Sequence, residues 1–198
     1  MGKIIVSENI TLDGMFADPM SEQDSAGDGW FARIRDADRA AFAELSRQEA
    51  LGAEALLLGR RTCAWFAERW PQRTGEWADK LNGMPKYVVS TSPEDPGWTN
   101  TTVLNGDVVE AVEKLRQAVD GETFVYGSGR LVRTLLEHDL VDELRLFAYP
   151  LVLGAGEHLL SGISRAKPLS LVSVLRAGEG LALLTYRPSG ARRTGGAG

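Results

Sequence analysis

Cysteine and histidine are scarce in this chain of 198 residues, which contains one cysteine and two histidines. A single cysteine, Cys63, cannot form an intramolecular disulfide, which fits a reducing compartment. With no histidine near it in the sequence, Cys63 is interpreted as a small buried side chain rather than a nucleophile. His138 and His158 stand in no recognised ligand spacing. We therefore expect neither a metal centre nor histidine catalysis.

Long apolar runs and an excess of basic residues are also missing. No run approaches the length of a membrane-spanning helix, and the amino terminus lacks the apolar stretch of a secretory signal. The net charge of −5 disfavours nucleic acid as a partner, because a phosphate backbone requires a broad basic face. We expect a cytoplasmic protein that binds neither membrane nor nucleic acid.

The composition that remains is ordinary for a globular protein, with 43% hydrophobic and 25% charged residues. The length favours a single domain, which we place at residues 1–188. Residues 189–198, "SGARRTGGAG", form a tail that we expect to be disordered, because it offers little to bury.

Short strand-like runs alternate with helical patterns along the first two thirds of the chain. The strands are expected at 3–9, 55–58, 87–90, 102–104, 123–126, 144–148, 169–173 and 181–186. The helices are expected at 36–50, from Thr62 onward, at 108–119 and at 131–137, with long loops at 18–30 and 71–85. The last strands follow one another without helices, so a parallel α/β arrangement should give way to antiparallel pairing.

The stretch "FVYGSGRLV", residues 124–132, passes from a buried strand through Gly-x-Gly into a helix. Glycines at such a turn let backbone N–H groups approach a phosphate closely. The third glycine of the dinucleotide fingerprint is replaced by Val132, so a bare tight turn remains an alternative interpretation.

Two further strand ends carry groups that suit an anion. In "GRRT", residues 59–62, Arg60 and Arg61 could hold a phosphate by forked hydrogen bonds, or could be solvated beside a helix capped by Thr62. Hydroxyl groups follow another strand at Ser90 and Thr91, as turn formers or as phosphate donors. Three such strand ends predict a dinucleotide crevice, and the paired arginines favour NADP over NAD.

These segments, in their order, resemble the dihydrofolate reductase-like superfamily, and most closely the bacterial branch related to the C-terminal reductase domain of riboflavin biosynthesis. The resemblance covers about residues 3–187, and "VDELRLFAYPLVLGAG" at 141–156 is its most specific part. It implies an α/β fold: a three-layer α/β/α arrangement with a mixed, mostly parallel eight-stranded sheet that ends in antiparallel strands. It also implies NADPH along the strand ends.

The resemblance assigns cofactor contacts residue by residue. The adenosine phosphates are expected at Gly59, Arg60, Arg61 and Thr62, and the 2′-phosphate near Ser90 and Thr91. The pyrophosphate is expected above the loop Gly127, Ser128, Gly129, Arg130 and Leu131. Asn9 and Phe16 are expected to flank the nicotinamide. Residues 18–30 do not align cleanly with the segment that carries the acidic residue of the folate pocket, so folate is not implied as the substrate.

The expected activity is hydride transfer from NADPH to an electron-poor C=N or C=O carbon of a small-molecule substrate. Asp13 is the first candidate for the proton donor, although it also fits a turn beside Gly14; Glu8 and Asp28 are weaker candidates. Trp30 and Phe31 could stack on a planar heterocycle or pack in the core.

Two other classes of function stay open, since the cofactor motifs are stronger than the catalytic ones. The chain could bind NADP as a sensor or scaffold without turnover, or it could keep only the fold. Apolar residues at 146–150 and 151–160 predict the seam of a homodimer.

Overall fold

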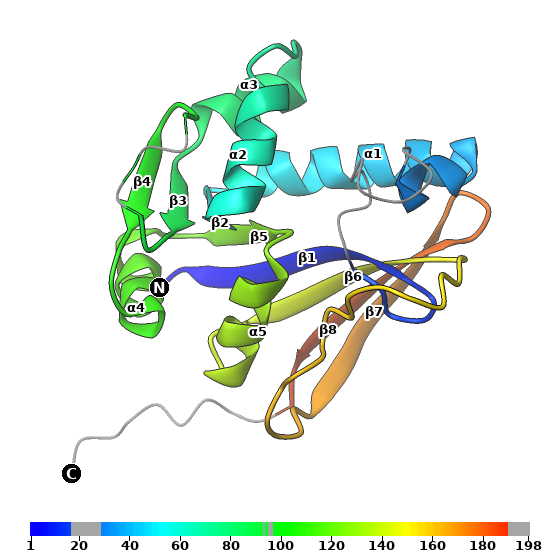
Figure 1. Cartoon of the computed structure of the whole chain (residues 1–198). Coiled ribbons are helices and arrows are strands. Elements are labelled where there is room, and N and C mark those ends of the chain that lie inside the picture. Colours follow the sequence, from blue (N-terminus) through cyan, green and yellow to red (C-terminus); the bar gives the residue numbers. More distant parts are fainter. Residues whose placement is uncertain (17–28, 93, 95–96, 190–198) are drawn as a thin grey trace.

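A mixed sheet of eight strands runs through the computed structural model, which describes residues 1–16, 29–92, 94 and 97–189 (Figure 1). The strands in chain order are β1 Lys3–Thr11, β2 Ala55–Gly59, β3 Lys86–Val89, β4 Thr101–Leu104, β5 Glu122–Tyr126, β6 Glu143–Tyr149, β7 Leu169–Ala177 and β8 Leu181–Pro188. Their order across the sheet is β4-β3-β2-β5-β1-β6-β8-β7.

Six neighbouring strands, from β4 to β6, run parallel to one another. The strand β8 runs antiparallel to both of its neighbours, β6 and β7. Ser7 of β1 lies beside Tyr126 of β5, and Gly59 of β2 lies beside Val89 of β3. Because parallel strands end at the same edge, the loops that follow β1, β2, β3 and β5 all leave one side of the sheet.

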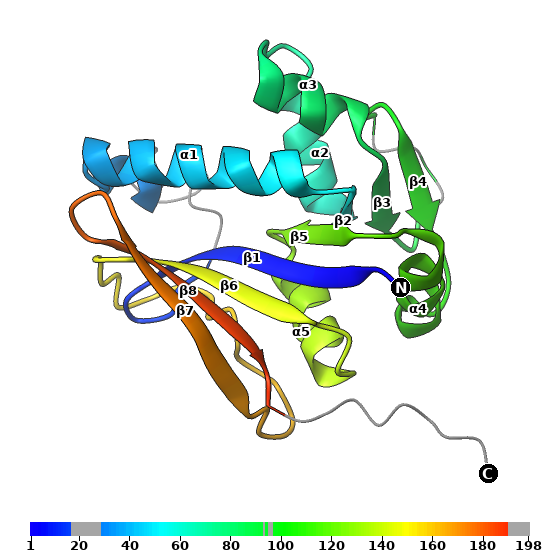
Figure 2. The same cartoon turned by 180° about the vertical axis from the view of Figure 1, so that it is seen from behind.

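Helices cover both faces of the parallel part (Figure 1, Figure 2). They are η1 Trp30–Arg33, α1 Asp36–Gly52, α2 Arg60–Arg69, α3 Glu76–Gly83, α4 Val108–Ala118 and α5 Gly129–Glu137. Ile4 and Val6 of β1 pack with α4 and α5, while Ile5 packs with α1, α2 and α3. All three are fully buried, as expected for an inner parallel strand with both faces covered.

The predicted fold class is confirmed, and the eight strands begin and end within two residues of the expected positions, apart from β7, which ends four residues later. The loop predicted at 18–30 and the disordered tail predicted at 189–198 lie almost wholly outside the described residues. Within the part of the chain that the structure describes, no helix has the length and apolar character needed to cross a bilayer.

Two local predictions are wrong. Thr62 does not cap α2: the helix begins at Arg60, Gly59 is its N-cap residue, and no side chain caps it. The hydroxyl of Thr62 instead accepts a hydrogen bond from Ser128, far away in the sequence.

The expected loop at 71–85 contains α3, whose Ala78 and Leu81 are buried in the core shared with α2. Tertiary packing therefore stabilises a helix that the local sequence signals weakly.

A buried lysine, Lys86, stands at the start of β3. Lys86 is fully buried, and its Nζ donates to the carbonyl oxygens of Asn82, Met84 and Thr99 at 2.8–2.9 Å. The same ammonium lies 4.4 Å from the ring centroid of Trp98. Burial lowers the pKa of Lys86 to about 8, while three carbonyl acceptors match the three N–H groups that only the ammonium form supplies. Lys86 thus joins the end of α3 to the start of β4.

Replacing this lysine should destabilise the fold. Lys86→Met removes the ammonium that donates to three carbonyl groups, one of them buried, and we expect the free energy of unfolding to fall by about 2–4 kcal/mol. Urea unfolding measures the loss. Lys114→Met is the matched control, because that ammonium is exposed and contacts only Glu110 four residues away; it should change stability by about 0.5 kcal/mol or less. Equal effects of the two substitutions would contradict the assigned role of Lys86.

Candidate functional site

The loops after β2 and β5 are joined by one serine hydroxyl. The backbone N–H of Gly59 donates to Ser128 Oγ at 2.7 Å, and Ser128 Oγ donates to Thr62 Oγ1 at 2.8 Å. Ser128 adopts the left-handed conformation, with φ of 67°. Such a conformation is uncommon for a residue other than glycine, so the two hydrogen bonds hold a backbone that the chain would not otherwise favour.

The two glycines that flank Ser128 leave no room for a side chain. Gly127 has a φ of 57°, and a Cβ built on it would lie 3.0 Å from Thr62 Cγ2. A Cβ on Gly129 would lie 2.4 Å from Cε1 of Phe16, so the ring of Phe16 packs directly on the first residue of α5. The loop after β1, the loop after β5 and α2 therefore meet at one point of the sheet edge.

Arg60 connects the loop after β3 to the same place. Its Nη2 donates to Glu94 Oε2 and its Nη1 to the Glu94 carbonyl oxygen, both at 2.9 Å. Within that loop, the N–H of Ser92 donates to Ser90 Oγ at 3.0 Å. The predicted phosphate-binding side chain of Arg60 thus faces an internal carboxylate that competes for the same donors.

Two other cations of the predicted cofactor loops have no such partner. Arg61 on α2 and Arg130 on α5 are exposed, and neither forms an ion pair with any residue that the structure describes. Both lie in the first turn of their helices, where the partial positive charge of the helix terminus adds to their own. Leu131, the next residue of α5, is buried in the core, and Thr91 is exposed.

The end of β1 places Asn9 beside an aromatic cluster. Tyr149 is fully buried, and its hydroxyl donates to Asn9 Oδ1 at 3.0 Å. Burial raises the pKa of Tyr149 above its usual range, so the hydroxyl stays protonated and donates. Asn9 is half-buried and its orientation is fixed by this contact.

Trp30 and Phe31 belong to the same aromatic cluster. Trp30 is 2% exposed, with its ring centroid 5.2 Å from that of Tyr149, and Phe31 lies edge-on to Phe42 at 5.4 Å. Trp30 therefore packs in the core, whereas Phe31 is only partly buried. Contact of either ring with a substrate stays a prediction.

Asp13 is held as an ionised turn former. Its carboxylate accepts hydrogen bonds from Thr11 Oγ1 at 2.6 Å, from the N–H of Gly154 at 2.8 Å and from that of Leu153 at 3.1 Å. The hydroxyl of Thr11, followed by the backbone donors, lowers the pKa of Asp13. A depressed pKa disfavours proton donation, so this geometry supports the turn interpretation. Asp28 lies outside the described residues.

Glu8 is a carboxyl group that is buried among apolar side chains. It is 3% exposed on the α5 face of β1, where Ile4 and Val6 precede it, and burial raises its pKa well above the usual range. The backbone N–H of Gly127 opposes that shift by hydrogen bonding to the carboxyl group, whereas Glu8 Oε1 has no hydrogen-bond partner among the described residues. The raised pKa favours the neutral form of this carboxyl group, which lies beside the glycine loop.

From the sequence, Glu8 ranks below Asp13 as a proton-donor candidate, and Glu94 is not identified. The alternation Ile4, Val6, Glu8 places a carboxyl group on an apolar face of a buried strand, and that signal could have ranked Glu8 higher. Glu94 gave no comparable signal, because its contact with Arg60 spans 34 positions.

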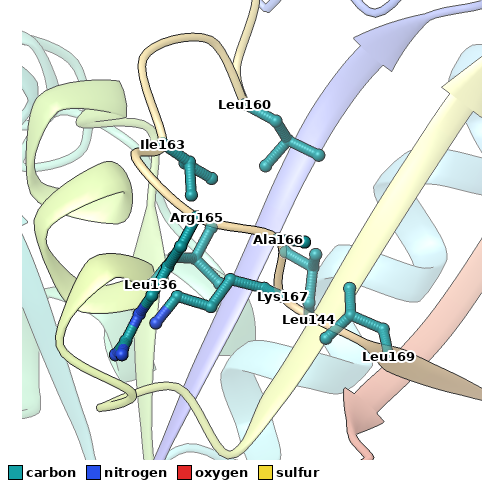
Figure 3. A pocket seen from close by; sticks show the side chains of 8 residues that line it. All are labelled: Leu136, Leu144, Leu160, Ile163, Arg165, Ala166, Lys167 and Leu169. Atoms are coloured by element: carbon teal, nitrogen blue, oxygen red, sulfur yellow. The ribbon is translucent and has the colours of Figure 1, made fainter.

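Other cavities lie away from the strand-end loops. Figure 3 shows one of about 280 Å³ between the end of α5, β6 and the segment before β7. The two cations on its rim, Arg165 and Lys167, are both paired with Asp139. Among the described residues, no group of three or more histidine, cysteine, aspartate or glutamate side chains could hold a metal ion.

Comparison with known proteins connects this geometry to one family. The family model described as the RibD C-terminal domain matches residues 2–183. The uncharacterized protein YyaP of Bacillus subtilis (strain 168) is 25% identical over 193 residues, which cover 95% of this chain and 96% of YyaP.

Two solved structures share the fold. A protein of Shewanella sp. PV-4 named for riboflavin biosynthesis superposes with a TM-score of 0.74 at 20% identity, covering 94% of this chain and 99% of that one. Dihydrofolate reductase from Enterococcus faecalis, complexed with NADP(H), superposes with a TM-score of 0.62 at 14% identity, covering 95% and 97%.

The protonation state of Glu8 can be tested through stability. Because the folded-state pKa is raised, the folded protein binds more protons than the unfolded chain above about pH 4.3, and stability that depends on Glu8 is lost as pH rises. Glu8→Gln keeps a neutral side chain of the same shape. Relative to the wild type, its free energy of unfolding should therefore increase with pH, by up to about 1.4 kcal/mol per pH unit.

Urea unfolding of both proteins between pH 4 and pH 8 measures this difference. Asp13→Asn is the opposite control: the depressed pKa of Asp13 makes its contribution present above the usual pKa, so this variant should lose stability relative to the wild type at neutral pH. A Glu8→Gln difference that stays constant across the range would show that Glu8 is ionised in the folded protein.

Proposed function

Because the chain belongs to the RibD C-terminal domain family, whose members are of the reductase type, we propose that it is an NADPH-dependent reductase. The observation that carries the proposal is the convergence of three strand-end loops, at residues 59–62, at 90–92 with Glu94, and at 127–131, through Ser128 and Arg60. Loops at the carboxyl ends of parallel strands, joined to helix N-termini, suit a bound dinucleotide.

The residues of these loops fit the phosphates of NADPH. Gly127 and Gly129 let the side chains of Thr62 and Phe16 pack directly on the loop after β5. We propose that N–H groups at the start of α5 bind the pyrophosphate. Arg61 and Arg130 supply cations that form no ion pair with the residues that the structure describes, and we assign the 2′-phosphate to Arg61 together with Arg60, near Ser90 and Thr91. Asn9 and Phe16 flank the position proposed for the nicotinamide.

When bound, NADPH would supply a hydride to a substrate carbon, and the protein residues would orient the two reactants. Asn9 is held by Tyr149 as a fixed polar group at the end of β1, and Phe16 shields the first turn of α5 from water. We propose a small planar heterocycle, or a carbonyl or imine compound, as the substrate. We also propose a cytoplasmic homodimer.

A second candidate is an NADP-binding sensor or scaffold without turnover. The state of Asp13 favours it, because a carboxylate with a lowered pKa and several internal donors is a poor proton donor. In this alternative the cofactor loops keep their role and no chemistry follows. Turnover of NADPH with a panel of pterins, pyrimidines, quinones and carbonyl compounds separates the two.

Cofactor binding is the first test. Calorimetric titration should give tighter binding of NADPH than of NADH, and Arg61→Ala should weaken NADPH binding roughly ten- to a hundredfold, since a charge-assisted contact contributes about 1.5–3 kcal/mol. Arg60→Ala should have a smaller effect, because Arg60 already has Glu94 as a partner. NADH binding should change little in either variant.

Arg73→Ala is the control, since that exposed guanidinium packs on the ring of Trp70 away from the loops. Equal affinity for NADPH and NADH in the wild type would remove the 2′-phosphate assignment of the arginines. Failure to bind either dinucleotide would contradict both candidate functions.

A further inference from the structure

One buried oxygen atom on β1 has no hydrogen-bond partner. Glu8 is 3% exposed, and its Oε1 atom forms no hydrogen bond with any residue that the structure describes. A buried polar atom without a partner is unfavourable in a folded protein, because it has lost its hydration and gained no bond in return. Such atoms are rare in native structures and are expected at functional sites, where a ligand can supply the missing partner.

Glu8 lies where three segments of the candidate site meet. The N–H of Gly127, the residue that follows β5, donates to its carboxyl group. The side chain of Glu8 is on the face of the sheet that α5 covers, and Phe16 packs both on that face and on Gly129, the first residue of α5. Asn9 is the next residue of β1. The carboxyl group is therefore close to the two residues that we propose to flank the nicotinamide.

The neighbour of Glu8 on β6 is apolar. In the register of the sheet, Glu8 is paired with Leu146. Leu146 belongs to residues 146–150, which the sequence predicts as part of a dimer seam. Leu146, Phe147 and Tyr149 are buried in an inner strand, so that part of the prediction is wrong. An aliphatic side chain offers no hydrogen bond, so this neighbour cannot satisfy the Oε1 atom of Glu8.

The carboxyl group of Glu8 is suited to donate a hydrogen bond. Burial raises the pKa of Glu8, the N–H of Gly127 opposes this shift, and no charge on a described residue is among its causes. The neutral form that burial favours has one O–H group. Because the N–H of Gly127 requires an acceptor oxygen, the proton belongs on the other oxygen, Oε1. A ligand that satisfies Glu8 must therefore present a hydrogen-bond acceptor to Oε1.

We propose that Glu8 binds the nicotinamide end of the cofactor, with its Oε1 atom donating to the carbonyl oxygen of the carboxamide group. This inference rests on the proposed function, in which Asn9 and Phe16 flank the nicotinamide. The pyrophosphate is another acceptor near these loops, but the apolar surroundings of Glu8 suit an uncharged amide better than a charged phosphate. A contact at the carboxamide fixes the rotation of the nicotinamide ring, and with it the direction in which the hydride leaves.

Calorimetric titration with two ligands tests the contact. NADPH and 2′-phospho-ADP-ribose share the phosphates, but the second ligand lacks the nicotinamide. Glu8→Met removes both carboxyl oxygens and should weaken NADPH binding about three- to tenfold, as expected for one hydrogen bond, while binding of 2′-phospho-ADP-ribose stays unchanged. Unchanged binding of the shorter ligand also shows that the variant is folded.

Two further variants are the controls. Glu8→Gln should bind NADPH within about twofold of the wild type, since its amide can accept from Gly127 and donate to the carboxamide oxygen. Tyr126→Phe should have no effect on NADPH binding. The Tyr126 hydroxyl is another buried group without a partner among the described residues, but its ring stacks on Phe66 on the opposite face of the sheet.

A cofactor analogue tests the same contact without a mutation. In the thionicotinamide analogue of NADPH, a sulfur atom, which is a weak acceptor, replaces the carboxamide oxygen. The wild type should bind this analogue about three- to tenfold more weakly than NADPH, whereas Glu8→Met should bind the two alike.

The outcomes separate this inference from the proposed function. Equal losses for NADPH and the shorter ligand in Glu8→Met, no loss for NADPH, or a wild type that binds the sulfur analogue as tightly as NADPH would overturn the role of Glu8 and leave the cofactor loops in place. A wild type that binds neither NADPH nor 2′-phospho-ADP-ribose would overturn the reductase proposal together with this contact.

Discussion

The hydroxyl group of Ser128 is the contact on which the candidate site depends. It accepts from Gly59 and donates to Thr62, and so fixes the loop after β5 against the start of α2. The strained backbone of Ser128 and the close approach of Gly127 to Thr62 are consequences of the same contact. Without it, two helix N-termini would still follow parallel strands, but their N–H groups would not be held toward a common point.

The two parts of the sheet differ in strand direction and in exposure. The parallel strands β1, β2, β3 and β5 are followed by the loops that we propose to bind the cofactor. The antiparallel pair β8 and β7 extends the sheet beyond the last inner strand and ends in an unpaired apolar edge.

Much of the fold could be predicted from the sequence, because buried parallel strands are short aliphatic runs such as "ALLLG" and "TFVY". The helix α3 could not, since its few apolar residues become informative only when α2 and the sheet are in place. For the same reason Thr62 was predicted to cap its own helix. The partner that engages its hydroxyl lies 66 positions further along the chain.

The candidate cofactor residues were predicted from loop motifs, and the structure brings most of them to one edge of the sheet. The charges were harder to predict. The pairing of Arg60 with Glu94, the neutral state indicated for Glu8 and the hydrogen bonds to Asp13 all depend on burial or on distant donors, which no local pattern encodes. The protonation states at this site are accordingly less determined by the sequence than the positions of its loops are.

The central claim is that the loops at 59–62 and 127–131 bind one dinucleotide together. Hydrogen–deuterium exchange with mass spectrometry, with and without saturating NADPH, tests it most directly. The account predicts that amide exchange slows in both loops at the same cofactor concentration, because Ser128 holds them as a unit. Protection of only one loop, or protection confined to other parts of the sheet, would contradict it.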